Sequence, residues 1–143
     1  MANNKLLNNF KDVLRKEGLK ITPQRIAVLE EIMKGEGHLE SEDVYMAIKV
    51  SKTHVSRATV YRTLDILVQH GFARKLNLGD GRARYERKID SPHHDHMICN
   101  NCGKIIEFVN DEIEKIQEEI TKQQQFKLQQ HIHQLFGICK ECQ

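Results

Sequence analysis

The residues best suited to hold metal ions are concentrated in one short stretch of the sequence. Residues 93–102 contain three histidines, one aspartate and two cysteines, and Cys99 and Cys102 form a C-x-x-C pair. The other two cysteines, Cys139 and Cys142, form a second such pair near the end of the chain. Four thiolates are a complete tetrahedral ligand set for structural Zn²⁺. We expect zinc rather than the main rival, a redox-active pair, because neither pair has a clear thioredoxin-like context.

The histidines of this stretch require other sites, because four thiolates leave no coordination position free on the zinc. If residues 93–98 are extended, successive side chains point to opposite faces. His94 and His96 then share one face, and His93 and Asp95 share the other. The sequence therefore predicts two further metal sites beside the cysteine cluster.

Two later segments offer more candidate ligands. A strand predicted at about residues 131–138 places His131 and His133 on one face. Glu107 lies in the middle of an apolar strand predicted at 104–109, where a carboxylate is costly to bury unless it is ligated or paired. No specific role can be assigned to His133, nor to His54 and His70, from the sequence.

The elements that position these residues fall into two groups, which together predict an α+β fold. Helices are expected at about residues 6–17, from the Thr22-Pro23 cap to about residue 34, after a Ser41 cap, and at 56–70. Basic strands at 72–78 and 82–87 flank the turn at Gly79-Asp80-Gly81. Ser91-Pro92 reads as a hinge, and strands near 96–98, 104–109 and 131–138 with a helix from about 111 follow it. We predict a winged-helix DNA-binding domain at 1–88 and a small α/β metal-binding dimerisation domain at 89–143.

The charge distribution agrees with this division. Residues 1–92 carry 17 Lys and Arg against 12 Asp and Glu, whereas residues 93–143 carry 5 against 8. The basic part is the candidate for binding a polyanion. On the helix predicted at 56–70, the face opposite the apolar stripe is small, hydroxylic and cationic, and a major groove can accept such a face. The candidate DNA-contacting residues on this helix are Arg57, Thr59, Tyr61 and Arg62.

The composition excludes several classes of protein. The chain has 143 residues, of which 29% are charged and 39% hydrophobic, as expected for a soluble globular protein. No apolar run approaches the roughly 20 residues that a membrane span requires. Residues 1–9 lack the apolar region of a secretory signal, so we expect a cytoplasmic protein. A zinc hydrolase or deaminase would need a general base beside its metal, but no matching motif is present. A metal storage protein would leave the winged helix unexplained.

Three runs of residues resemble the ferric uptake regulator family of metal-dependent bacterial repressors. They are G-L-K-I-T-P-Q-R at 18–25, A-T-V-Y-R at 58–62, and the H-H-D-H-M-I-C-N-N-C-G-K-I-I-E-F stretch at 93–108. The likeness spans nearly the whole chain. It implies a homodimer in which a metal ion, Fe²⁺ with Mn²⁺ or Zn²⁺ as substitutes, fixes two winged helices for binding to palindromic operator DNA.

The resemblance also implies roles for individual residues. The family's regulatory site corresponds to His38, Glu86, His94, His96 and Glu107. A further, auxiliary site in many members corresponds to His93, Asp95, Glu114 and His131, and the cysteines correspond to a structural zinc. DNA contacts fall on Tyr61 and Arg62, with Lys20 reaching the minor groove. Without the resemblance, His38 and Glu86 would each be expected at the solvated surface.

A peroxide-sensing repressor is the main alternative within this family. In that branch, bound iron oxidises a ligand histidine, and aspartate typically stands at the positions of Glu86 and Glu107. The two glutamates and Arg62 favour iron sensing here. The expected function is therefore an iron-dependent repressor that controls iron uptake, not an enzyme.

Overall fold

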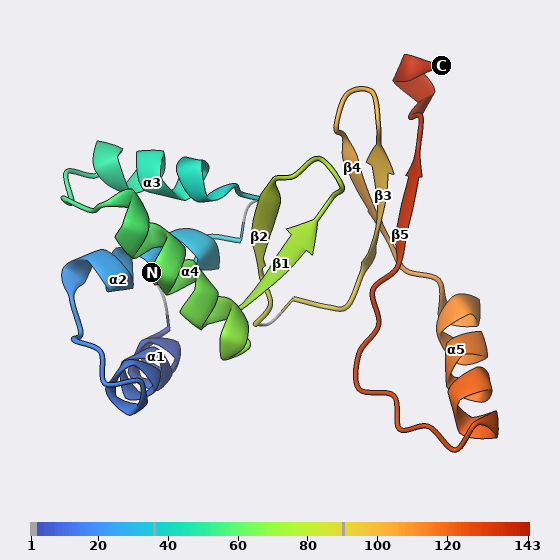
Figure 1. Cartoon of the computed structure of the whole chain (residues 1–143), viewed down its shortest axis with the longest axis horizontal. Coiled ribbons are helices and arrows are strands. Elements are labelled where there is room, and N and C mark those ends of the chain that lie inside the picture. Colours follow the sequence, from blue (N-terminus) through green and yellow to red (C-terminus); the bar gives the residue numbers. More distant parts are fainter. Residues whose placement is uncertain (1–2, 36, 90) are drawn as a thin grey trace. The chain divides into compact units, whose positions relative to one another are not determined.

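The computed structural model describes residues 3–35, 37–89 and 91–143, and it confirms the α+β fold class (Figure 1). The chain divides into two compact units, residues 1–91 and 92–143. The first unit has four helices followed by a two-stranded sheet: α1 Asn4–Lys16, α2 Pro23–Met33, α3 Ser41–Val50, α4 Arg57–Gln69, β1 Ala73–Asn77 and β2 Ala83–Arg87. The second has a three-stranded sheet, one α-helix and a short 3₁₀ helix: β3 Asp95–Cys99, β4 Ile105–Phe108, α5 Asp111–Gln123, β5 Gln134–Gly137 and η1 Lys140–Cys142.

Local capping residues set where the helices of the first unit begin. The Thr22 side chain accepts a hydrogen bond from the Arg25 amide, and proline follows at the first helical position of α2, as predicted. Ser56 caps α4 in the same way, through the amide of Thr59. The predicted Ser41 cap is wrong by one residue. Glu40 is the N-cap of α3, because its backbone N–H donates to Asp43 at 2.8 Å and leaves Ser41 inside the helix.

The core of the first unit is formed by apolar faces of all four helices and the sheet. Phe10 and Leu14 of α1 are fully buried, and Phe10 makes an edge-to-face contact with Phe72, with 5.7 Å between ring centroids. Val28, Leu29, Ile32 and Met33 line the buried side of α2. About a dozen such side chains are buried, and each contributes roughly 1.5–3 kcal/mol to the stability of this unit.

The two strands after α4 form an antiparallel hairpin. Their register pairs Ala73 with Arg87 and Asn77 with Ala83. The turn between them needs a left-handed backbone at Gly79 and Gly81, whose φ angles are 78° and 76°. Helices followed by this hairpin have the architecture of a winged helix.

The second unit is built around β3, which lies between its two neighbours in the order β4-β3-β5. It pairs antiparallel with β4 and parallel with β5. The predicted strand at 131–138 is too long, since β5 contains only Gln134–Gly137, and His131 and His133 precede it. Both still face the same residue, Asp95. The unit buries little: within it, only Asp95, His96, Ile98 and Cys99 are among the buried residues described, and α5 has none.

Candidate metal centres and nucleic-acid interface

Four cysteine sulfurs converge near one end of the sheet in the second unit. Cys99 ends β3, Cys102 lies in the following turn, and Cys139 and Cys142 come after β5. Their Sγ atoms all lie within 4.8 Å of one another, and none of the four forms a disulfide. The Cys102 and Cys139 sulfurs are 3.7 Å apart. Tetrahedral zinc with Zn–S bonds of ~2.3 Å separates its sulfur ligands by about 3.8 Å, so the residues fit a structural zinc site.

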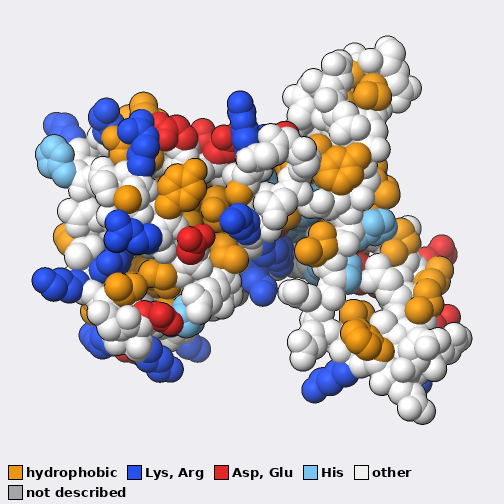
Figure 2. Space-filling model, in the orientation of Figure 1, with side chains coloured by type: hydrophobic (Ala, Val, Ile, Leu, Met, Phe, Trp, Pro, Cys, Tyr) orange, Lys and Arg blue, Asp and Glu red, His pale blue; other side chains and the backbone are white. Residues whose placement is uncertain are grey.

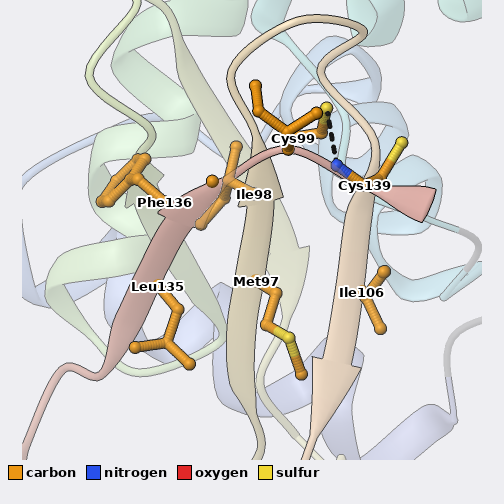
Figure 3. A pocket seen from close by; sticks show the side chains of 9 residues that line it. Met97, Ile98, Cys99, Ile106, Leu135, Phe136 and Cys139 are labelled. Carbon is orange, nitrogen blue, oxygen red and sulfur yellow. Dashed lines mark hydrogen bonds between the residues drawn. The ribbon is translucent and has the colours of Figure 1, made fainter. Parts of the chain in front are cut away.

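The surroundings shift the pKa values of Cys99 and Cys139 in opposite directions. The backbone N–H groups of Cys102 and Cys139 donate to Cys99 Sγ at 3.5 and 3.3 Å, and these bonds lower the pKa of the Cys99 thiol to about 6 (the second bond is dashed in Figure 3). Burial, followed by hydrogen bonds with the other cysteines, raises the pKa of Cys139 to about 12. Four adjacent thiolates repel one another, so a divalent cation is required for all four to ionise together.

A second cluster in the same unit consists of two histidines and two carboxylates. His93 Nε2 lies 3.3 Å from Asp95 Oδ1 and 3.3 Å from Glu114 Oε1. His131 Nε2 lies 3.2 and 3.4 Å from the same two oxygens. A tetrahedral metal with bonds of 2.0–2.1 Å holds its ligand atoms about 3.3 Å apart. All four separations match this value, so the cluster fits a four-coordinate ion such as Zn²⁺.

The other face of the same stretch carries a separate group of ligands. His94 and His96 pack edge to face with 4.8 Å between ring centroids. His94 Nε2 lies 3.5 Å from Glu107 Oε1, and Glu107 is the register partner of His96 across β3 and β4. The predicted separation of His94 and His96 from His93 and Asp95 is thus observed. Its cause is the alternation of side chains in extended chain.

In the first unit, the partly buried His38 pairs with the buried Glu86. Leu39 and Tyr85 exchange two backbone hydrogen bonds of 3.0 and 2.7 Å, which fasten the segment before α3 to β2. His38 Nε2 then lies 3.1 Å from Glu86 Oε2, and only 12% and 7% of the two side chains are exposed. Arg74 of β1 also approaches Glu86, at 3.4 Å. The pair offers one imidazole and one carboxylate, which suit a metal that prefers nitrogen and oxygen ligands.

The burial of His38 and Glu86 corrects the expectation of a solvated surface for both. The cause is the Leu39–Tyr85 bridge, a contact between segments 46 residues apart. No local pattern in the sequence signals it.

The outward face of α4 carries most of the predicted DNA contacts. Tyr61 and Arg62 are exposed, while Thr59 is half-buried and its hydroxyl accepts a hydrogen bond from Ser56 at 3.0 Å. Lys20, in the turn before α2, is also exposed. Figure 2 shows Lys and Arg side chains distributed over the visible face of this unit. A cationic surface around an exposed helix suits the phosphate backbone of DNA.

Arg57, the first residue of α4, is restrained. Its guanidinium makes two hydrogen bonds to Glu42 of α3, at 2.9 and 2.8 Å, and stacks over the Tyr45 ring at 4.3 Å. Hydrogen bonding to Glu42 raises the pKa of Arg57 and lowers the pKa of Glu42. These two bonds use two of the five N–H donors of the guanidinium. In the hairpin, Arg84 forms an ion pair with Asp80 at 2.7 Å.

A comparison with protein families decides what kind of protein carries these sites. Residues 16–136 match the model of the ferric uptake regulator family. The chain belongs to this family. Ferric uptake regulators are metal-responsive transcriptional regulators, so the predicted recognition and general function are confirmed.

Individual members of the ferric uptake regulator family are similar over most of the chain. The ferric uptake regulation protein of Campylobacter jejuni is 45% identical over 96% of this chain and 88% of its own length. The peroxide operon regulator of Bacillus subtilis is 35% identical over 92% and 89%. The solved structure of the Helicobacter pylori ferric uptake regulator, described as having three functional metal binding sites, superposes with a TM-score of 0.85 at 38% identity, covering 95% of this chain and 90% of that one.

None of the helices in the described part of this regulator combines the length and apolarity needed to cross a membrane.

Proposed function

We propose that this regulator is a homodimeric, cytoplasmic repressor that binds palindromic operator DNA when loaded with Fe²⁺ and thereby controls iron uptake. The observation that carries the proposal is the presence of paired imidazole and carboxylate groups on each side of Ser91-Pro92: His38 with Glu86 before it, and His94 with Glu107 after it. A metal that takes ligands from both units couples its own binding to the angle at this hinge.

The regulatory site in this proposal contains His38, Glu86, His94, His96 and Glu107. To shift an equilibrium from about 1:99 to 99:1, the metal must favour the DNA-binding state by roughly 5.5 kcal/mol. Several bonds from nitrogen and oxygen ligands can supply that difference. The family resemblance supports the assignment.

The glutamates at positions 86 and 107 favour iron sensing over peroxide sensing. Imidazole and carboxylate ligands accept Fe²⁺, Mn²⁺ and Zn²⁺, and affinity alone ranks zinc above iron. The physiological metal therefore depends on geometry and availability. Because the chain is 35% identical to a peroxide operon regulator, an experiment must distinguish iron sensing from peroxide sensing.

An open apolar face in the second unit supports the homodimer. Side chains from all three strands line a hollow beside the cysteines, with Met97, Ile106, Leu135 and Phe136 each more than a third exposed (Figure 3). Ile116 and Ile120 of α5 are also more than half exposed. A unit of about 50 residues with so few buried side chains would bury more apolar surface by packing against a second copy of itself. The apolar sheet face is proposed as that interface.

The remaining predicted residues complete the proposal. Zinc at Cys99, Cys102, Cys139 and Cys142 stabilises the second unit, and an auxiliary ion is held by His93, Asp95, Glu114 and His131. In the first unit, α4 enters the major groove. There Arg62 and Tyr61 contact bases or phosphates, Thr59 and Arg57 lie at the start of the helix, and Lys20 reaches the adjacent minor groove.

A mobility-shift titration tests the proposal. Zinc-loaded protein prepared without oxygen is titrated onto an A/T-rich palindromic duplex, with and without Fe²⁺ or Mn²⁺, beside an Arg62→Ala control. We expect retardation that requires the metal and is lost in the control. Equal retardation of the duplex with and without the metal refutes metal-dependent repression. If stoichiometric peroxide abolishes binding and adds 16 Da to a ligand histidine, the protein is a peroxide sensor.

A further inference from the structure

Asp95 presents its two carboxylate oxygens to different surroundings. Only 2% of its side chain is exposed, and Oδ1 faces His93 and His131 within the proposed auxiliary site. Oδ2 is buried and has no hydrogen-bond partner in the described part of the chain. Buried polar atoms in folded proteins are nearly always paired, so this oxygen requires an explanation.

His133 places the complementary group beside that oxygen. Its Nδ1 lies 3.8 Å from Asp95 Oδ2, beyond hydrogen-bond length, and is itself buried without a hydrogen-bond partner among the described residues. One imidazole nitrogen and one carboxylate oxygen are therefore both buried, without hydrogen-bond partners, and 3.8 Å apart. A closing movement of less than about 1 Å satisfies both.

Two contacts hold the His133 ring in this place. Its backbone carbonyl accepts a hydrogen bond from the His96 amide at 3.2 Å, next to Asp95 in the chain. Its ring meets Phe108 edge to face, with 5.5 Å between centroids. Phe108 is the register partner of Asp95 across β3 and β4. His133, Asp95 and Phe108 thus form one row across the sheet.

The position of His133 favours an indirect role. The four ligand atoms of the proposed auxiliary site all lie within 4.8 Å of one another, and His133 is not part of that group. Its Nδ1 lies 3.8 Å from Asp95 Oδ2, whereas His93 and His131 contact Oδ1. We propose that His133 is a positioning residue that donates its Nδ1–H to Asp95 Oδ2 while Oδ1 binds a divalent cation in the auxiliary site. This inference rests on the auxiliary site of the proposed function.

The physical effect is on the carboxylate. A hydrogen bond to the oxygen that does not bind the metal fixes the Asp95 rotamer, so that Oδ1 is already oriented when the ion arrives. Partners of this kind around metal ligands typically change affinity by 10–100-fold when they are removed. The role requires a proton on Nδ1 of His133.

Co²⁺ titration of the zinc-loaded full chain tests the proposal. All proteins carry His38→Ala and His94→Ala, which remove two ligands of the proposed regulatory site, and the thiolate absorption band reports any exchange at the cysteines. Glu114→Gln identifies the auxiliary site by abolishing its absorption transition. We expect His133→Ala to lower the Co²⁺ affinity of the auxiliary site, measured by this transition, by 10–100-fold. His133→Asn, whose amide N–H can replace Nδ1–H, should restore it, and His54→Ala, which removes an exposed histidine of the other unit, should leave it unchanged.

Each other outcome contradicts a defined part of the argument. If Glu114→Gln changes nothing, the auxiliary site itself is absent and the inference fails with it. If the site is present but His133→Ala binds Co²⁺ as tightly as its parent, His133 does not position Asp95. If His133→Asn is as weak as His133→Ala, the ring acts by packing on Phe108 or by direct ligation, and the hydrogen-bond role is refuted.

Discussion

Replacing Cys99 with serine should unfold the second unit while leaving the first intact. Cys99 is 5% exposed, accepts two backbone hydrogen bonds and is one of four converging sulfurs. Serine keeps an acceptor there, but its hydroxyl does not ionise and cannot replace a thiolate on zinc. Structural zinc contributes about 10–16 kcal/mol in small zinc-dependent folds. That is as large as the whole stability of an ordinary domain, about 5–15 kcal/mol.

The first unit should survive because its core is independent of the cysteines. The side chains of the main hydrophobic cluster all come from residues 10–85. Hydrogen exchange followed by mass spectrometry should therefore show loss of protection in β3, β4 and β5 and retention in α2 and α4. Zinc content should fall by one ion per chain. Asn101→Ser, an exposed change in the same turn, is the matched control. A Cys99→Ser protein that keeps its zinc, or keeps protection in β3, refutes this reasoning.

Three further predictions address sensing, DNA binding and assembly. His96→Ala should leave a folded dimer by size-exclusion chromatography but abolish metal-dependent DNA retardation; loss of the dimer would show that sensing and structure are not separate. Arg62→Ala should weaken operator binding by about 1–3 kcal/mol without changing the melting temperature, and an unchanged Kd in the mobility-shift titration would remove Arg62 from the interface. Phe136→Asp should convert the dimer to a monomer, since an unpaired buried carboxylate costs several kcal/mol; a dimer that persists in analytical ultracentrifugation places the interface elsewhere.

Features set by local chemistry were predictable from the sequence. Thr22-Pro23 and Ser56 mark helix starts because capping involves residues no more than three positions apart. The separation of His94 and His96 from His93 and Asp95 needed only the two-residue period of extended chain. Glu40 rather than the expected Ser41 is the N-cap of α3, because Glu40 and Asp43 form a capping box in which the Glu40 backbone N–H donates to the Asp43 side chain.

Features set by distant contacts were not predictable in the same way. The burial of His38 depends on a bridge from Leu39 to Tyr85, whose two segments carry no matching local signal. The start of β5 was placed at about residue 131, whereas pairing with β3 starts only at Gln134. Arg57 looked like a free cation until the packing of α3 beside it placed Glu42 and Tyr45 against its guanidinium.

The alternation around β3 explains how one short stretch can serve three different metal sites. Successive side chains point to opposite faces, so His93 and Asp95 are committed to one site and His94 and His96 to another, while Cys99 lies at the end of the strand. Sliding β3 by one residue against β4 would exchange the two histidine faces and move Cys99 away from the other sulfurs. A zinc ion at the cysteines would resist such a slip, because Cys99 lies at one end of the strand and Cys139 follows the neighbouring strand. In the proposed function, the structural zinc therefore also fixes the register of β3, and with it the ligands available to the two other proposed metal sites.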